Sequence, residues 1–286
     1  MTPLLEIEGL SVGFRVDGGG ESLAVRDLSL TMGREKVGIV GESGSGKSLT
    51  ARAILGVQST SARVAARKIR FDGIDLGRAS PRTLRALRGD RIGMIMQDPR
   101  HSLNPVHRIG DQIVESIRLG ARAEGRRLSR RAALGLARDM LASVDIRDPD
   151  RVLRLYPHEV SGGMGQRVMI AIAFVREPDL LIADEITSAL DVTVQARVLE
   201  ILDEMISRRD MGLIFISHDL PLVSRFCDRV LVMYQGRVVE EIAARDLSRA
   251  THPYTQGLMR CMPQIDGDRA PLPVLARDDA WLEADG

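Results

Sequence analysis

The sequence predicts an α/β fold with a helical region inserted among the strands. Short apolar runs of strand length recur along the chain, and several are apolar on both faces, which is typical of a parallel sheet covered by helices. Between residues 100 and 177 the apolar positions change to helical spacing. The runs that predict strands are residues 4–12, 23–30, 36–40, 68–71, 91–96, 180–183, 213–217 and 229–234.

Composition narrows the class of protein. The chain has 286 residues, of which 44% are hydrophobic and 28% charged, as in globular rather than disordered or fibrous proteins. Its net charge of +1 creates no overall field that attracts nucleic acid or anionic lipid. Cys227 and Cys261 form no C-x-x-C pair, which excludes a disulfide framework and a cysteine-built zinc site and indicates the cytoplasm.

We expect no membrane-spanning or secretory segment. The most apolar stretches are four to six residues long, whereas a bilayer-spanning helix needs about 20. Residues 1–8 lack the basic region and the long apolar run of a secretory signal.

The inserted region and the tail differ from the strand-rich parts. Ile109, Ile113 and Ile117 repeat at the spacing of one helix face, and Pro157 interrupts the helical pattern. Residues after 250 are rich in Pro, Asp and Arg, which predicts an appendage that is partly flexible beyond Asp266.

A glycine-rich loop gives the first chemical signal. Residues 41–48 match G-x-x-x-x-G-K-[ST] between a strand and a helix-compatible run, the context of a phosphate-binding loop (P-loop). In such a loop Lys47 reaches the outer phosphates of a nucleoside triphosphate and the Ser48 hydroxyl ligates Mg²⁺. The alternative is a chance glycine-rich turn. The predicted nucleotide-binding residues are Gly41, Glu42, Ser43, Gly44, Ser45, Gly46, Lys47, Ser48 and Leu49.

Two carboxylates end the apolar strand at residues 180–183. Asp184 is expected near the Mg²⁺, and Glu185 is expected where it can polarise an attacking water. Taken alone, the pair could equally be a solvated strand end.

A second glycine-rich segment lies just upstream. Ser161, Gly162 and Gly163 open a helix-compatible run, and a Ser-Gly-Gly in that place offers a hydroxyl and bare N–H groups to an anion. Here the chain resembles the ATP-binding cassette (ABC) ATPases, whose signature begins L-S-G-G.

Further motifs follow in the order of that family. Gln97 resembles the Q-loop glutamine, the segment ending in Asp191 resembles the D-loop, and His218 resembles the switch histidine. Phe14 lies at about the position of the aromatic residue that stacks on adenine. Taken singly, each has another interpretation. Gln97 could be a turn amide, Asp191 a helix cap and His218 a capping histidine. Phe14 could be a core aromatic.

The resemblance implies a P-loop NTPase core with an N-terminal antiparallel β subdomain and an inserted helical subdomain. The core would comprise residues 1–100 and 178–250, the helical (signature) subdomain 101–177, and a C-terminal extension 251–286. Two such domains sandwich two ATP molecules, so that each ATP contacts the P-loop of one chain and the signature of the other. The implied catalytic residues are Glu185, His218 and Gln97, and the implied Mg²⁺ ligands are Ser48, Gln97 and Asp184.

Several segments are similar to the ATPase subunits of peptide and nickel importers. The most particular are S-L-N-P at residues 102–105 and H-P-Y-T at residues 252–255, since neither is needed to hydrolyse ATP. The resemblance implies a subunit on the cytoplasmic face of the cell membrane that powers uptake of peptides or a related solute. Its partners would be a second, homologous ATPase in a heterodimer or homodimer, two membrane permeases that dock around residues 97–107, and indirectly an extracytoplasmic solute-binding protein.

The chain departs from the family at three positions: Arg34 and Gly165 replace the usual Gly and Arg, and Ile186 replaces the usual Pro after Glu185. We expect active but slowed hydrolysis. Cys261 alone cannot hold the four-cysteine iron–sulfur cluster of many relatives, so we expect none on this chain. The alternatives are a soluble ABC ATPase that acts on nucleic acid or ribosomes, and a module that binds ATP without turnover. Near-zero net charge argues against the first, and the presence of Glu185 and His218 against the second.

Overall fold

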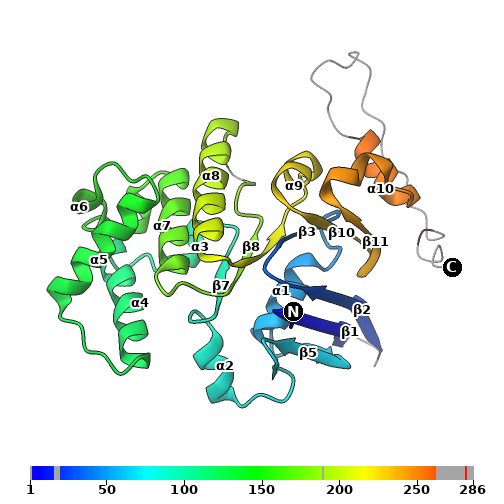
Figure 1. The fold of residues 1–286 in the computed structure, drawn as a ribbon, viewed down its shortest axis with the longest axis horizontal. Helices are drawn as coiled ribbons and strands as arrows, with labels where there is room; N and C mark the ends of the chain where they lie inside the picture. Colours follow the sequence, from blue (N-terminus) through cyan, green and yellow to red (C-terminus); the bar gives the residue numbers. More distant parts are fainter. Residues whose placement is uncertain (1, 16–19, 189, 262–280, 282–286) are drawn as a thin grey trace. The chain divides into compact units, whose positions relative to one another are not determined.

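The computed structural model describes residues 2–15, 20–188, 190–261 and 281, and the chain divides into two units. The first comprises Met1–Arg78 and Phe215–Gly286, and the second is the continuous segment Ala79–Ile214. The first unit therefore contains both the blue and the orange parts of the ribbon in Figure 1. The tail beyond Asp266, expected to be partly flexible, lies outside the described residues apart from Trp281.

An antiparallel sheet forms the N-terminal part of the first unit. Its strands are β1 (Leu5–Arg15), β2 (Glu21–Met32), β4 (Ala62–Ala65), β5 (Lys68–Phe71) and β6 (Ile74–Asp75), in the order β2-β1-β5-β6 with β4 also paired to β1. Along β1, Leu5, Ile7, Leu10 and Val12 are all at most 1% exposed although their spacing changes after Ile7. An irregularity in the pairing with β2 falls at this point, around Gly9 with φ 64°, and it keeps all four side chains buried.

A second group of strands in this unit carries the phosphate-binding loop. β3 (Lys36–Val40) lies parallel to β10 (Arg229–Tyr234), and β11 (Arg237–Ala243) returns antiparallel to β10. Gln235 and Gly236 make the turn between β10 and β11 with φ angles of 44° and 87°. Two successive positive φ angles are those of a two-residue hairpin turn.

Short helices complete the first unit: α1 (Lys47–Leu55), α9 (Leu220–Phe226), η2 (Ala244–Arg249) and α10 (Pro253–Arg260). Helix α1 begins inside the glycine-rich loop and ends at Gly56, which adopts φ 62° and closes the last turn. The side chain of Asp219 caps the start of α9 by accepting from the N–H of Leu222 at 2.9 Å.

In the second unit, β7 (Ile92–Ile95) and β8 (Leu180–Asp184) lie side by side and parallel. All five residues of β8 are buried, as the prediction of a strand with two apolar faces requires. Helix α8 (Val192–Arg209) follows, and the chain passes into the first unit within β9 (Gly212–Ile216). Because β7 and β8 are parallel neighbours, the residues after their carboxyl ends emerge at the same edge of the sheet.

The helical region predicted between the strands is present in the second unit and is coloured green in Figure 1. It contains α3 (Pro99–Ser102), α4 (Ile109–Ala123), α5 (Arg130–Ser143), α6 (Pro149–Val152), η1 (Pro157–Glu159) and α7 (Gly162–Phe174). A further short helix, α2 (Pro81–Leu87), precedes β7 and lies outside the predicted helical region. Ile109 and Ile113 on α4 are fully buried and Ile117 is 8% exposed, which confirms the predicted helix face. None of the described helices is both long and apolar enough to cross a membrane.

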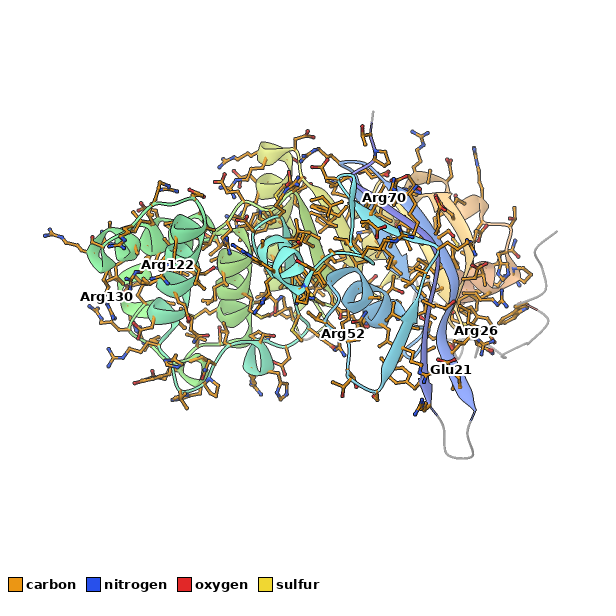
Figure 2. The ribbon with its side chains drawn as sticks, turned by 90° about the horizontal axis from the view of Figure 1, so that it is seen from below. Glu21, Arg26, Arg52, Arg70, Arg122 and Arg130 are labelled. Carbon is orange, nitrogen blue, oxygen red and sulfur yellow. The ribbon has the colours of Figure 1, made fainter. Side chains whose placement is uncertain are left out.

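Charged side chains cover the surface of both units. Arg122 and Arg130 project from the helical region, and Arg26, Arg52 and Arg70 project from the first unit (Figure 2). Exposed pairs such as Arg130 and Asp111, 2.6 Å apart, balance part of this charge. Such exposed pairs contribute little to stability, about 0–1 kcal/mol each.

Candidate functional site

The predicted phosphate-binding loop joins β3 to α1, and its geometry requires two of its glycines. A Cβ atom at Gly41 would lie 2.1 Å from the carbonyl oxygen of Met233, and one at Gly46 would lie 2.6 Å from that of Ala24. Both glycines also have positive φ angles, 150° and 100°. The absence of side chains therefore lets the loop approach β2 and β10 this closely.

Lys47 opens α1 and folds back into the loop. The residue is 4% exposed, and its ammonium group donates to the carbonyl oxygens of Gly41 and Glu42, each at 2.8 Å. A buried ammonium needs such partners to offset its desolvation. The bonds keep a positive charge within the loop.

The start of α1 and the loop together offer hydrogen-bond donors to an anion. Gly46, the N-cap residue, has no side chain that could occupy the N–H groups of the first turn. A cavity of about 180 Å³ lies at the loop, between residues 42–45 and the pair Tyr234 and Gln235. The positive end of a helix and the N–H groups of its first turn are the features that bind phosphate in proteins.

The acid pair lies at the carboxyl end of β8 in the second unit. Asp184 is the last residue of the strand and is 6% exposed. Glu185 follows with φ 50°, a conformation that non-glycine residues rarely adopt. Strained backbone of this kind is concentrated at functional sites.

Gln97 meets this acid pair. Its amide nitrogen donates to Glu185 Oε2 at 3.0 Å and to Ser188 Oγ at 3.4 Å. The Ser188 hydroxyl in turn donates to the carbonyl oxygen of Glu185 at 3.0 Å. The structure thus brings together Gln97 and Glu185, which the sequence predicts to act on the same nucleotide, and adds Ser188, which was not predicted as a site residue.

The predicted signature forms the start of α7. Ser161 is the N-cap, and its hydroxyl accepts from the N–H of Met164 at 3.3 Å, which leaves its proton available to a ligand. Nothing lies within 4 Å of a Cβ placed at Gly162, whereas one at Gly163 would lie 2.8 Å from Val194 Cγ1. Gly162 therefore keeps the approach to the helix start open, and Gly163 permits close packing on α8.

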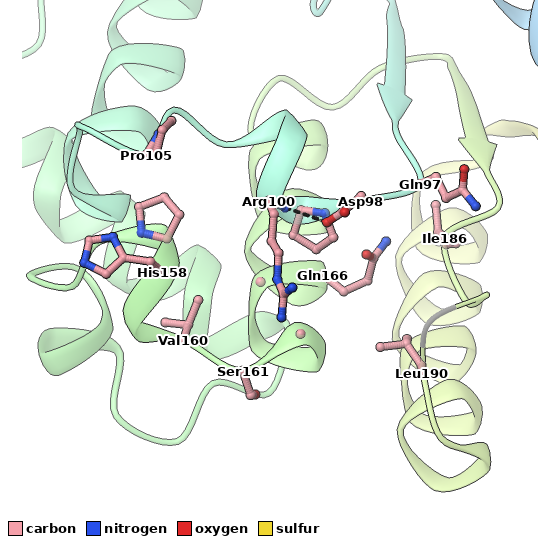
Figure 3. Close-up of a pocket in the computed structure, with 14 residues that line it drawn as sticks. Gln97, Asp98, Arg100, Pro105, His158, Val160, Ser161, Gln166, Ile186 and Leu190 are labelled. Carbon is pink, nitrogen blue, oxygen red and sulfur yellow. Dashed lines mark hydrogen bonds between the residues drawn. The ribbon is translucent and has the colours of Figure 1, made fainter.

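A cavity of about 520 Å³ in the second unit separates the signature from the segment after Gln97 (Figure 3). Gln166 and Ile186 form part of its wall, and Arg100 extends across it from α3. The amide nitrogen of Gln166 is buried without a hydrogen-bond partner among the described residues. Gly165, which replaces an arginine of the family pattern, also lines this cavity, and a Cβ there would lie 3.0 Å from that of Pro99.

The remaining predicted residues lie as follows. Asp191 is the N-cap of α8, where its carboxylate accepts from the N–H groups of Thr193 and Val194 at 3.1 and 3.0 Å. His218 is exposed just after β9 in the first unit. Phe14 is half-buried in β1, opposite Ser22 of β2. Ala189, in the D-loop segment, lies outside the described residues.

The structure adds one residue to the phosphate-binding loop that the sequence did not place there. Tyr254 is fully buried, and its hydroxyl accepts from the N–H of Glu42 at 3.1 Å. The H-P-Y-T segment was the one signal for Tyr254 in the sequence, since it resembles the importer ATPases although ATP hydrolysis does not need it. Its contact partner lies 212 residues away, a separation that no local pattern reveals.

Comparison with known proteins identifies the family. A family model described as ABC transporter matches residues 25–188, more than half of the chain. A putative peptide import ATP-binding protein of Brucella abortus is 46% identical over 275 residues, which cover 96% of this chain and 81% of the relative. The dipeptide transport ATP-binding protein DppD of Escherichia coli is 45% identical over 278 residues, 95% of this chain and 82% of the relative.

Solved structures of low sequence identity show the same fold. The dimeric ATP-binding cassette MJ0796 bound to ADP and Pi has a TM-score of 0.74 at 22% identity and covers 84% of this chain and 99% of its own. CbiO1 of Clostridium perfringens has a TM-score of 0.70 at 24% identity, and the match covers 87% of this chain and 92% of CbiO1. The expected fold and family are therefore confirmed, and the proteins named here give no support to a role on nucleic acid or ribosomes. The chain belongs to the ABC transporter family and is an ATPase of that family.

Proposed function

We propose that this chain is the ATP-hydrolysing subunit of an importer that takes up peptides or a related small solute across the cell membrane. The observation that carries the proposal is the extent of the match: relatives named for peptide and dipeptide transport are 45–46% identical over 95–96% of this chain. A match over that share of the chain spans residues 102–105 and 252–255 as well as the ATPase motifs. The substrate itself contacts other polypeptides, so the choice among peptide, nickel and similar solutes lies outside this chain.

In this function Glu185 is the general base for hydrolysis. A carboxylate at the end of a buried strand, bonded to one amide, can accept a proton from the water that attacks the γ-phosphate. Gln97 holds the carboxylate in place through its amide N–H. His218 is proposed to contact the γ-phosphate, and Phe14 to stack on the adenine.

The residues proposed as Mg²⁺ ligands carry oxygen donors that suit this ion. Ser48 supplies a hydroxyl, Asp184 a carboxylate and Gln97 an amide oxygen, and hard oxygen ligands of this kind together with phosphates are what Mg²⁺ prefers. Asp184 is buried, and a buried carboxylate gains from a cation beside it. Bound Mg²⁺ would neutralise charge that develops on the β- and γ-phosphate oxygens. The protein residues hold the phosphates and orient the water.

A second ATPase chain completes each nucleotide site in this proposal. The P-loop of this chain would face the signature of the partner, and Ser161, Gly162 and Gly163 would face the partner's ATP. The open approach at Gly162 supports this role, since a phosphate can reach the start of α7 without meeting a side chain. The S-L-N-P and H-P-Y-T segments resemble those of importer subunits that pair with a similar but non-identical ATPase. This resemblance favours a heterodimer, with a homodimer as the alternative. Asp191, which caps α8, is proposed to stiffen the D-loop at this interface.

A groove of about 600 Å³ in the second unit is proposed to receive the permease. It lies between β7, α4 and α7 and includes Leu103, Asn104 and His107 of the predicted docking segment. Gln112 fixes this segment, since its amide nitrogen donates to the carbonyl oxygens of Asn104 and His107 at 3.1 and 3.0 Å. The S-L-N-P sequence is thereby held at the rim of the groove, a few residues after Gln97. A short permease helix docked there would act on Gln97 through the backbone of residues 97–107.

We also propose that the chain holds no iron–sulfur cluster and works at the cytoplasmic face of the membrane as a peripheral subunit. A cluster needs four thiolates, and this chain has only Cys227 and Cys261. Burial raises the pKa of the Cys227 thiol to about 12, which makes it a poor source of a thiolate ligand. An iron-dependent absorbance of the purified chain would contradict this.

Affinity purification tests the proposal as a whole. The chain carrying Glu185→Gln is isolated from detergent-solubilised host membranes in the presence of ATP, because this variant should bind ATP without releasing its partner. We expect two multispanning permeases and a related ATPase, together with ATPase activity of the unmodified complex. Ribosomal or DNA-bound partners would overturn the importer proposal.

A further inference from the structure

The C-terminal helix α10 places an aromatic side chain directly on the phosphate-binding loop. The ring of Tyr254 packs on that of Tyr234 at the end of β10, with centroids 4.4 Å apart. Tyr254 is fully buried, and its hydroxyl accepts from the N–H of Glu42 at 3.1 Å. The second residue of the loop is therefore held by a residue near the other end of the chain.

Tyr254 and Lys47 hold opposite sides of the same residue. The hydroxyl of Tyr254 accepts from the N–H of Glu42, and the ammonium group of Lys47 donates to its carbonyl oxygen at 2.8 Å. A peptide segment fixed at both its N–H and its C=O cannot rotate without breaking one bond. Tyr254 thus fixes the residue that supplies one of the two carbonyl oxygens to which the Lys47 ammonium donates.

The start of α10 is itself firmly attached to β11. Glu240 Oε1 accepts from the N–H groups of Thr251 and His252 at 2.7 and 3.3 Å. His252 caps the helix, since its Nδ1 accepts from the N–H of Tyr254 at 3.2 Å. Burial acts to raise the pKa of Glu240, but the polar groups of Thr255, Thr251 and His252 around its carboxylate outweigh this, so the pKa lies below its usual range. A carboxylate that stays charged keeps these bonds, and Tyr254 stays in place.

Trp281 joins the same cluster. Its ring lies 5.7 Å from that of Tyr254 and 5.5 Å from that of Tyr234, and its carbonyl oxygen lies 3.1 Å from His252 Nε2. Trp281 is the one tryptophan of the chain. Its emission therefore reports directly on the surroundings of Tyr254.

We propose that Tyr254 is a positioning residue for the ATP phosphates and that it couples nucleotide binding to Trp281. The inference rests on the proposed role of the loop in ATP binding. When Lys47 moves to the phosphates, its bond to Glu42 changes, and the change reaches Trp281 through the Glu42–Tyr254 hydrogen bond and the contact between the tilted rings of Tyr254 and Trp281. The H-P-Y-T segment thereby acquires a role in nucleotide binding.

Two measurements test it. In the unmodified chain, titration with ADP and Mg²⁺ should change the emission of Trp281, and calorimetry gives the dissociation constant independently. Tyr254→Phe keeps the ring and removes only the hydroxyl, and it should weaken ADP binding about threefold to tenfold and reduce the emission change. Tyr156→Phe in the second unit is the matched control and should leave both unchanged.

The outcomes separate this inference from the proposed function. If the unmodified chain binds no nucleotide, the proposed function fails. If it binds nucleotide with no change in Trp281 emission, or if Tyr254→Phe binds as tightly as the unmodified chain, the inference is overturned while the proposed function stands. Thermal unfolding of Tyr254→Phe identifies a variant that does not fold, and the emission of the unmodified chain then decides alone.

Discussion

Gln97 and Glu185 are 88 residues apart in the sequence and are joined by one hydrogen bond of 3.0 Å between Nε2 and Oε2. The bond exists because β7 and β8 are parallel neighbours, with Ile95 opposite Ala183, so that both residues emerge at the same edge. The amide therefore fixes the position of the Glu185 carboxylate. The groove proposed for the permease is lined by Met96, the residue before Gln97, so a movement there would reach Glu185 through Gln97.

Gln97→Glu should slow ATP hydrolysis about 10-fold more than Gln97→Ala, because it places a second carboxylate where the amide donates to Glu185 Oε2, and like charges at that distance repel. Gln97→Ala removes the donor without adding charge and serves as the control. Steady-state ATPase assays measure both variants. Equal rates in the two variants would contradict a contact between residue 97 and Glu185 during hydrolysis.

Lys47→Ala should weaken ATP binding about 10-fold to 100-fold, as expected for loss of a charge-assisted hydrogen bond. Lys68→Ala is the control, because Lys68 pairs with Glu6 and Glu8 at 2.8 and 3.2 Å in the antiparallel sheet and lies outside the loop. Calorimetry with ATP and Mg²⁺ measures both. Equal affinity in the two variants would remove Lys47 from the site.

Two glycines on helices should respond oppositely to replacement by alanine. Gly135 on α5 has nothing within 4 Å of the position that a Cβ would take, so Gly135→Ala should raise the free energy of unfolding by about 0.5–1 kcal/mol through helix propensity. At Gly110 on α4 a Cβ would lie 2.6 Å from the carbonyl oxygen of Leu153. Gly110→Ala should therefore lower the free energy of unfolding by about 1–3 kcal/mol. Urea unfolding measures both, and effects of the same sign would refute the packing described at Gly110.

The two thiols should react at different rates. Burial raises the pKa of Cys227 to about 12, with Asp228 adding to the shift and Lys36 opposing it. At pH 8 only about one Cys227 in ten thousand is then a thiolate, the form that reacts. Cys261 is partly exposed, so a thiol reagent should label one site in the folded chain and two after unfolding. Rapid double labelling of the folded chain would show that Cys227 is not buried in solution.

Local patterns predicted the elements whose residues carry a strong period. The helix face at Ile109, Ile113 and Ile117 and the continuous apolar strand β8 are examples, because burial on one or both faces leaves a signature in the sequence. β11 was not predicted: its residues are half-buried or exposed with no alternation, and its place depends on the tight turn at Gln235 and Gly236. Gly236, which follows the apolar run at residues 229–234, was the signal for that hairpin in the sequence.

The candidate site was predictable where a motif fixes local backbone. The phosphate-binding loop and the capping roles of Ser161 and Asp191 follow from nearby residues alone. The contact of Tyr254 with Glu42 was not predictable, because it depends on how α10 packs after more than two hundred residues of chain. Ser188 likewise becomes a partner of Gln97 only once β7 and β8 are paired.

The division of the chain also determines the order in which it can fold during synthesis. The second unit, Ala79–Ile214, is continuous, so all the residues of its internal contacts are present once residue 214 has left the ribosome. β3, by contrast, finds its parallel neighbour β10 only when residues 229–234 emerge. Val37 and Ile39, which are fully buried in the folded chain, therefore lack their neighbours on β10 during most of translation. Contacts between residues so far apart in the sequence form slowly. A growing chain stalled before β10 would expose these residues to chaperones or to aggregation while its helical region was already folded.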